Sequence, residues 1–426
     1  MKYKLFVWIL ILSLVCSLFA CSQIEINDNV QELKAQVLNE DWSYSASDDH
    51  PIDLYYIPTK SLQYVNGSIY VFNRTIDDIV TLVRLDQESG NITSVCSDPL
   101  CNHNTIECPF GGNISGISIY QDEIYYWRSF MRKNVATGKY DQTIRQFCSY
   151  NLKTMNFTVH IEQAILNGIS SGQYMKMLFA DEYCYFYDYV YYKETDTYQW
   201  LLKKMNINSS DVSVVNEIEN STDFPADVFL FIIEDRIYFK NPGEIYSTDI
   251  NLNNKIVHVK GKFLSEDIFT NGKYIFYSVL DESGMAETIH RVNLDGTNDV
   301  DLGISSAVNW CLTENYIYYF IPNQFDIPAG EDGFEVTMYF DSIFRCDFEG
   351  KNREHVITLD PKQNSEIDAL YQLTEMVVAG NYIYSGFYSF KDVNMNEKVD
   401  AGEYVYNSLG VMRIDINEHT AEIIMQ

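Results

Sequence analysis

The sequence predicts an all-β fold: a single propeller of four-stranded blades, with seven blades preferred and six or eight as the alternatives. Three observations predict it. A short aromatic strand recurs seven times, a second strand motif follows the copies, and amphipathic segments with helical periodicity are nearly absent. Neighbouring blades bury each other's faces, so such repeats build one continuous core. A β-sandwich pair or a β-solenoid is the competing architecture.

The composition excludes several classes of protein. Of the 426 residues, 46% are hydrophobic and 21% are charged, which is enough apolar material for a large core and argues against a disordered chain. Lys and Arg total 30 and Asp and Glu total 60, so the formal net charge is −30. A surface this acidic repels phosphate backbones, and we therefore expect no nucleic-acid partner.

The N-terminal residues have the pattern of an export signal. Lys2 and Lys4 supply positive charge, and the apolar run 5–15 is too short to span a bilayer comfortably but has the length of a signal h-region. The run leads into Leu18-Phe19-Ala20-Cys21, which resembles the lipobox of bacterial lipoproteins. The resemblance implies cleavage before Cys21 and a diacylglyceryl group on its thiol. A plain signal peptide or an N-terminal membrane anchor is the alternative.

This pattern divides the chain into three segments. We expect a lipoprotein signal peptide at 1–20, the lipidated Cys21 with a flexible tether at 21–41, and the propeller at 42–426. The lipid would hold the propeller against the membrane, on the outer face of the cell.

The aromatic strand is the strongest repeat. A typical copy is Tyr316–Tyr319, and a turn pair such as Asn66-Gly67 precedes most copies. These pairs supply the positive φ that tight hairpins need. Consecutive copies lie 38 to 66 residues apart, and because a bare blade needs about 40 residues, the longer intervals must contain insertions. The seven copies begin at Ser68, Glu123, Tyr183, Arg236, Tyr274, Tyr316 and Tyr382.

A second motif, with a central basic residue and a final Asp or Asn, follows the aromatic strand. Apolar segments such as 229–233 precede the aromatic strands, and others such as 355–357 follow the second motif, which makes four strands per unit. The clearest copies of the motif begin at Leu82, Ile289, Ile343 and Val411, and weaker ones begin at Phe147, Leu202 and Ile245.

These two motifs carry a family resemblance. The strand at Tyr316–Tyr319 and the Arg-x-Asp-x-x-Gly stretch at Arg345–Gly350 resemble the propellers of the low-density-lipoprotein-receptor-related and TolB-like proteins. Together with the lipobox, they make the chain similar to secreted lipoproteins of low-GC Gram-positive bacteria. The resemblance covers about Ser61 to the C-terminus and implies a propeller fold without a specific activity. The Tyr-Trp-Thr-Asp tetrapeptide of the receptor propellers does not occur in the sequence.

The long insertions fall at related positions of the blades. When the inner strand of a blade comes first, the loop between its second and third strands emerges on the same face as the connection to the next blade. We therefore expect irregular loops, and any binding site, to gather on that face. The insertions are at 128–143, 189–199, 322–338, 390–406 and 96–115.

The last of the blade insertions contains a candidate calcium site. Oxygen-bearing residues alternate along 392–403, which resembles the twelve-residue EF-hand or dockerin loop. A hard cation needs six or seven oxygens, and alternate residues of a tight loop point inward. Glu397 stands where that family has Gly, and a solvated acidic turn is the alternative. The predicted ligands are Asp392, Asn394, Asn396, Lys398 through its carbonyl, Asp400 and Glu403.

A second cluster consists of Cys96, Cys101, His103 and Cys108. Thiolates and an imidazole can hold zinc, although this spacing is not a standard zinc pattern. Outside the cell a disulfide is the default, but seven Cys remain after Cys21, and an odd number leaves at least one unpaired. Disulfide, zinc site and free thiols all stay open. The remaining cysteines lie in apolar strands and are predicted to be core residues: Cys148, Cys184, Cys311 and Cys346.

Two functions follow from these features. The first is a lipid-anchored, calcium-stabilised propeller outside the cell that binds a protein or glycan ligand without catalysis. The second is an extracellular hydrolase or lyase that acts on a carbohydrate or peptide. Its carboxylates would come from the insertion loops, for example Asp326, Glu331, Asp332 and Glu335.

Overall fold

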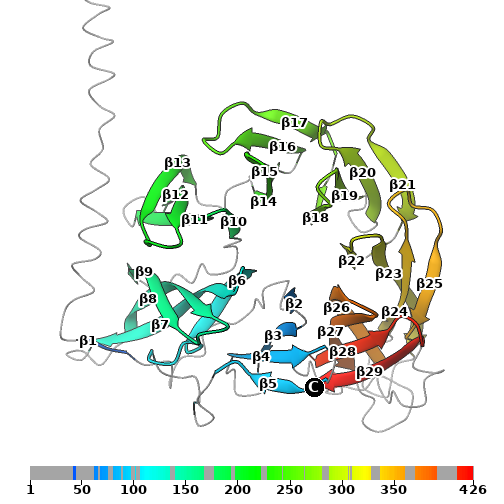
Figure 1. Cartoon of the computed structure of the whole chain (residues 1–426), viewed down its shortest axis with the longest axis horizontal. Coiled ribbons are helices and arrows are strands. Elements are labelled where there is room, and N and C mark those ends of the chain that lie inside the picture. Colours follow the sequence, from blue (N-terminus) through cyan, green and yellow to red (C-terminus); the bar gives the residue numbers. More distant parts are fainter. Residues whose placement is uncertain are drawn as a thin grey trace, which may run out of the picture.

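A computed structural model shows the chain as a closed ring of seven antiparallel sheets, viewed down the ring in Figure 1. Within the described residues, no helix is long and apolar enough to cross a membrane. The prediction of an all-β propeller with seven blades is confirmed. The structure describes residues 42–425 except 45–61, 66–67, 75–79, 88–89, 97–100, 102–105, 135–139, 167–176, 193–196, 222–227, 242, 263, 281–286, 306, 308, 328–335, 360–369 and 391–409.

Each blade is built from four consecutive strands, inner strand first. Blade 1 contains β2 (Leu62–Val65), β3 (Ser68–Arg74), β4 (Val80–Asp86) and β5 (Ile92–Ser94). Blade 2 contains β6 (Asn113–Tyr120), β7 (Glu123–Asn134), β8 (Tyr140–Asn151) and β9 (Phe157–Leu166). Blade 3 contains β10 (Leu178–Ala180), β11 (Tyr183–Tyr192), β12 (Thr197–Asn206) and β13 (Val212–Ser221).

The other four blades repeat this order. Blade 4 contains β14 (Val228–Ile233), β15 (Arg236–Asn241), β16 (Glu244–Asp249) and β17 (Ile256–Lys260). Blade 5 contains β18 (Leu264–Thr270), β19 (Tyr274–Leu280), β20 (Glu287–Asn293) and β21 (Val300–Ser305). Blade 6 contains β22 (Asn309–Leu312), β23 (Ile317–Ile327), β24 (Val336–Cys346) and β25 (Glu354–Thr358). Blade 7 contains β26 (Leu370–Ala379), β27 (Tyr382–Phe390), β28 (Gly410–Asp415) and β29 (Thr420–Met425).

The second strand of each blade explains the aromatic repeat. Successive side chains of a strand point to opposite faces, and both faces of a blade are buried here. Thus Ile69 packs against blade 7, whereas the next residue, Tyr70, packs against blade 2. Cys184 takes the isoleucine position in blade 3 and is also fully buried. The isoleucines at this position are all 0% exposed: Ile69, Ile124, Ile237, Ile275, Ile317 and Ile383.

The third strand explains the second motif. Its cationic residue lies over an aromatic ring at the start of the neighbouring strand. Arg291 is 4.4 Å from the centroid of Tyr274, the first residue of β19, and Arg345 is 4.9 Å from that of Tyr316, which directly precedes β23. The motif's final Asp then orders the turn. In blade 6, Asp347 accepts hydrogen bonds from the backbone N–H groups of Glu349 (3.0 Å) and Lys351 (2.8 Å). The Arg-x-Asp pattern is therefore structural.

Side-chain contacts close the ring between blades 1 and 7. Blades 1 and 7 lie side by side in Figure 1, yet no strand passes between their sheets. Their contact is a cluster of buried side chains that includes Leu85, Ile69 and Tyr384. One side chain also crosses this contact, because Gln87 donates through Nε2 to the carbonyl of Ala379 at 2.9 Å.

The short strand β1 (Trp42–Tyr44) belongs to blade 2. It pairs antiparallel with the last residues of β7, Trp42 with Asn134 and Tyr44 with Arg132. The inner strand β6 pairs only with the first part of β7, from Glu123 to Ser129. The chain thus joins the propeller at Trp42 and extends the inner edge of blade 2.

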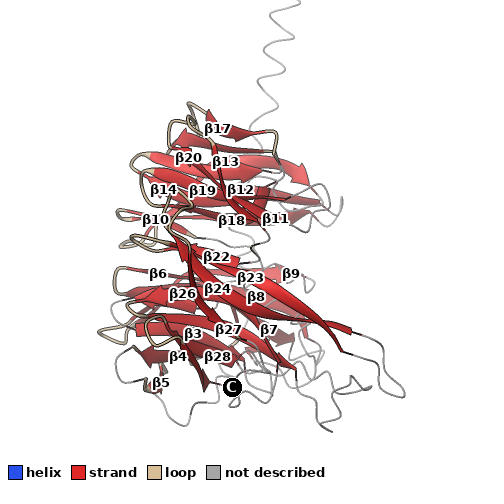
Figure 2. Cartoon of the chain, turned by 90° about the vertical axis from the view of Figure 1, so that its right-hand side faces the viewer, coloured by secondary structure: helices blue, strands red, loops and turns tan. Residues whose placement is uncertain are grey.

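The two faces of the ring differ in their connections. Turns of two to seven residues join first to second and third to fourth strands, and we call this side the turn face. Figure 2 shows these turns in tan, gathered mainly along one edge of the ring. We call the other side the insertion face, because the second-to-third connections and the links between blades emerge there. The two longest connections of the propeller, 95–112 and 391–409, both belong to it.

The insertions themselves are more regular than expected. The segment 128–143 is mostly strand, because β7 continues to Asn134 and β8 begins at Tyr140. The hairpins in blades 3 and 6 are extended in the same way. Pairing satisfies the backbone groups of these extensions, and residues such as Tyr189 and Val190 favour strands. The prediction of irregular loops at these three positions was therefore wrong.

Candidate functional site

The cysteine cluster is the predicted site that the structure assembles. Cys96, Cys101 and Cys108 lie on the connection between β5 and β6, and their three sulfurs are within 4.8 Å of one another. Cys108 is buried, whereas Cys96 and Cys101 are half-buried. Such a group of thiols can hold a metal ion. His103, the fourth predicted member, lies outside the described residues.

A buried arginine holds the segment that carries Cys108. Arg128 of β7 is 1% exposed and donates to the carbonyls of Cys108, Pro109 and Ile106, the last at 3.0 Å. Its Nε donates to Gln146 at 2.8 Å. A buried guanidinium needs such acceptors, and three of the four named here are backbone carbonyls. The segment 106–109 is therefore fixed against blade 2.

Aromatic packing also holds the same connection against blade 2. The ring of Phe110 stacks on Tyr126 at 5.8 Å and meets the edge of Tyr150 at 4.9 Å between centroids. The hydroxyl of Tyr126 donates to the carbonyl of Pro109 at 2.6 Å. Gly112 then ends the connection with φ of 86°, and a Cβ there would lie 2.7 Å from the carbonyl oxygen of Ser129. Only glycine fits this conformation without displacing β7.

The thiols of the chain differ in their surroundings. Burial, and then the hydrogen bond with Cys101, raise the pKa of the Cys108 thiol above its ordinary value. Burial raises the pKa of Cys148 and of Cys346 to about 12 each. Along with Cys184, these two are fully buried, which agrees with their prediction as core residues, whereas Cys311 is only half-buried. Buried neutral thiols of this kind are unreactive.

Several predicted site residues lie outside the described residues: Cys21, the calcium ligands Asp392, Asn394, Asn396, Lys398, Asp400 and Glu403, and the acidic residues Glu331, Asp332 and Glu335. The strands beside the calcium loop are described, and β27 ends at Phe390 and β28 begins at Gly410 on the insertion face. Asp326, the remaining candidate for catalysis, is the penultimate residue of β23 and pairs with Thr337.

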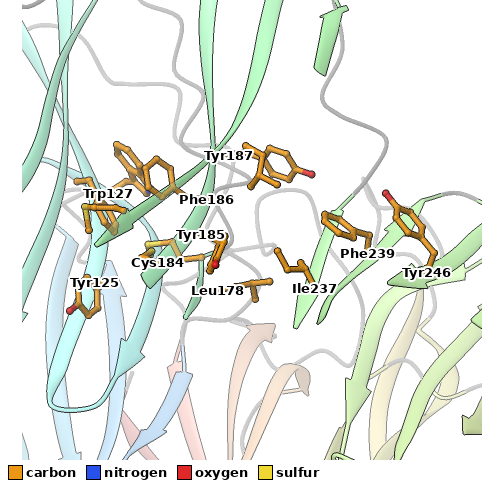
Figure 3. Close-up of a cluster of buried hydrophobic side chains, with 14 residues drawn as sticks. Tyr125, Trp127, Leu178, Cys184, Tyr185, Phe186, Tyr187, Ile237, Phe239 and Tyr246 are labelled. Atoms are coloured by element: carbon orange, nitrogen blue, oxygen red, sulfur yellow. The ribbon is translucent and has the colours of Figure 1, made fainter. Parts of the chain in front are cut away.

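Buried charges in the blades are the residues that sequence analysis missed. Asp188 is 1% exposed and accepts from Arg145 at 2.7 Å and from Lys203 at 2.6 Å, which joins blade 2 to blade 3. Arg145 also lies over the ring of Trp127 at 4.2 Å. Trp127 belongs to the aromatic cluster between these blades that Figure 3 shows. The sequence contained one indication of these buried ion pairs, which is a charged residue inside an apolar strand, as at Arg128 and Asp188. Such a charge must be paired when it is buried.

Comparison with known proteins supports the fold. No family model matches the chain, and neither does any curated protein. Among solved structures, a prolyl endopeptidase matches at a TM-score of 0.51 and 11% identity, over 85% of this chain and 49% of that chain. The chain thus spans about half the length of that enzyme.

Two further solved structures are less similar. The β-propeller domain of the Trilobed protease from Pyrococcus furiosus, described as having an open velcro topology, matches at a TM-score of 0.47 and 8% identity, over 86% of this chain and 97% of that domain. Oligogalacturonate lyase from Vibrio parahaemolyticus matches at 0.44 and 10% identity, over 72% and 82% of the two chains. At these identities the likeness concerns the fold and not an activity.

Proposed function

We propose that this chain is a lipid-anchored propeller outside the cell that binds a protein or glycan through its insertion face. The observation that carries the proposal is the contrast between the two faces. The turn face consists of short, hydrogen-bonded turns, whereas the two longest connections, 95–112 and 391–409, and the extended hairpins of blades 2, 3 and 6 belong to the insertion face. Loops and hairpin tips on a rigid scaffold are the usual place for binding residues.

Site-specific photo-crosslinking tests this proposal. A photoreactive amino acid would replace Lys133 or Asp326 on the insertion face, and Asn254 or Glu418 on the turn face as matched controls. Each full chain would be exposed to its native cell envelope and irradiated. We expect discrete crosslinked species only from the insertion-face positions. Crosslinks of equal yield from both faces, or from the turn face alone, would contradict the proposal.

The lipid anchor belongs to the same proposal and rests on the lipobox at 18–21. Metabolic labelling with a radioactive fatty acid should label the full chain, and Cys21→Ala should abolish the label and release the protein from the membrane fraction. Cys311→Ala is the matched control and should keep both. Equal labelling of the Cys21→Ala chain would refute the anchor.

Calcium bound by Asp392–Glu403 would order the longest connection of this face. Isothermal titration of the full chain with calcium chloride should show one site that Asp392→Ala removes. We expect weak binding, of the order of 10⁻⁴–10⁻³ M, as in extracellular calcium modules. Asp295→Ala, on the turn face, is the control. Identical titrations for the wild type and Asp392→Ala would exclude this site.

A further inference from the structure

The cysteine cluster combines ligands from three points of one connection. Cys96 follows β5 by two residues, Cys108 precedes β6 by five residues, and Cys101 lies between them. Their sulfurs nevertheless lie within 4.8 Å of one another at the junction of blades 1 and 2. The three thiols therefore lie at one place although they come from different points of the connection.

The spacing of the sulfurs fits a tetrahedral metal ion. Zinc–thiolate bonds of about 2.3 Å put the sulfurs of a tetrahedral site about 3.8 Å apart. Three sulfurs already within 4.8 Å need to move only about 1 Å to form one face of that tetrahedron. A disulfide would join two of them and leave the third thiol against the bond, which does not account for three converging sulfurs.

The surroundings hold the ligands in place before any metal binds. Arg128 and Tyr126 fix the carbonyls around Cys108, and the Val95 N–H, next to Cys96, donates to the carbonyl of Leu82 at 3.0 Å. Both ends of the connection are thus attached to blades, so ordering them adds little cost to metal binding. The guanidinium of Arg128 also lies beside this segment. Its charge offsets the net charge of −1 that three thiolates and one divalent cation carry.

We propose that Cys96, Cys101 and Cys108 bind one thiophilic divalent cation, Zn²⁺, which fastens the connection between blades 1 and 2. As the three sulfur–zinc bonds form, each thiol gives up its proton to solvent, and no electron is transferred. The fourth coordination position is left for a further donor. The site is independent of the proposed ligand binding on the insertion face, and its failure would leave that proposal intact.

Metal analysis of the full chain tests the site. The chain and its Cys96→Ser and Cys101→Ser variants would be purified after growth with zinc, and the metal would be measured by plasma mass spectrometry. We expect one zinc per wild-type chain and an affinity at least about 100-fold lower in each variant, measured by competition with a chelator. Because both residues are only half-buried, these variants should fold, and circular dichroism would verify this. Cys311→Ser, in blade 6, is the matched control and should keep the zinc.

Cobalt gives a second readout that a merely structural role of the cysteines would not produce. Replacing zinc with Co²⁺ should give thiolate-to-cobalt charge-transfer bands, which Cys101→Ser should reduce by about one third. Two results would overturn the proposal. One is a chain isolated with two of these sulfurs joined in a disulfide, detected by intact mass before and after reduction. The other is equal zinc content in the wild type and the Cys101→Ser variant.

Discussion

Blade 1 packs against blade 2 on one side and against blade 7 on the other, and the two junctions are built differently. Toward blade 2, the chain is continuous, and an 18-residue connection, which carries the three neighbouring cysteines, is held by Arg128 and by Phe110. Toward blade 7, no strand of the described residues joins the two sheets, and the junction includes a packed apolar cluster and the hydrogen bond from Gln87 to Ala379. A ring built from consecutive strands has one such junction. Its closure must therefore rely on the quality of its apolar contact.

The largest expected effect tests this contrast directly. Ile69→Ala at the closure and Ile124→Ala at the junction of blades 1 and 2 each remove the same fully buried side chain. Each should lower the free energy of unfolding by about 4 kcal/mol in urea titrations. Hydrogen exchange should differ, because Ile69→Ala would speed exchange in both blades 1 and 7, where no connection limits their separation. The same exchange pattern in both variants would show that closure is not the weaker junction.

Arg128→Met tests the junction between blades 1 and 2. It keeps the apolar length of the side chain but leaves the carbonyls of Cys108, Pro109 and Ile106 without their donor. We expect a loss of about 3 kcal/mol in unfolding free energy. The control Arg291→Met, at the junction of blades 5 and 6, removes the bonds to the Phe348 carbonyl and to Glu349 and should cost about 1 kcal/mol. Equal losses of unfolding free energy in the two variants would mean that Arg128 does not anchor the connection between β5 and β6.

The junction between blades 6 and 7 contains a contact whose contribution to stability depends on pH. Asp341 of β24 is 2% exposed and accepts from the backbone N–H of Leu373 in blade 7 at 3.0 Å. Burial raises the pKa of its carboxyl to about 6. Because the folded pKa exceeds the unfolded one, near 3.9, the folded state loses stability as pH rises from about 4 to about 6.

Asp341→Asn should remove this pH dependence while keeping an oxygen that accepts from Leu373. At pH 7 the variant should be more stable than the wild type by on the order of 2 kcal/mol, and at pH 3.5 the two should be alike. Urea unfolding at several pH values measures both. Parallel pH profiles for the two chains would contradict the assignment.

The smallest effect concerns the single hydrogen bond across the closure. Gln87→Glu keeps the size of the side chain but removes the Nε2 donor to Ala379. The loss should be about 1 kcal/mol, because one neutral hydrogen bond contributes little next to the buried cluster. Gln63→Glu, on β2, serves as the control. Gln146→Glu would not serve, because Gln146 contacts Arg128. A loss as large as that of Ile69→Ala would mean that polar contacts dominate closure.

The sequence predicted the blades better than the features between them. An apolar residue, isoleucine in six blades, and then an aromatic residue repeat in each second strand because every blade meets two neighbours, so seven copies indicated seven blades. Cys96, Cys101 and Cys108 were grouped as one candidate cluster because they lie within thirteen residues, but the sequence left a disulfide, a zinc site and free thiols open. The pairing of Trp42–Tyr44 with β7 was missed because three residues outside the repeat give no periodic signal. The role of Arg128 depends on carbonyls some twenty residues away, which no local pattern reveals.

The attachment of β1 sets the point at which the proposed lipid anchor would act on the ring. β1 leaves blade 2 beside Asn134, at the insertion-face end of β7, so any pull from a lipid upstream acts on that rim and not on the ring's centre. The twenty residues between Cys21 and Trp42 reach at most about 70 Å when fully extended. A propeller tied in this way would stay within that distance of the bilayer, and the partners within its reach would be those embedded in, or lying close to, the same membrane.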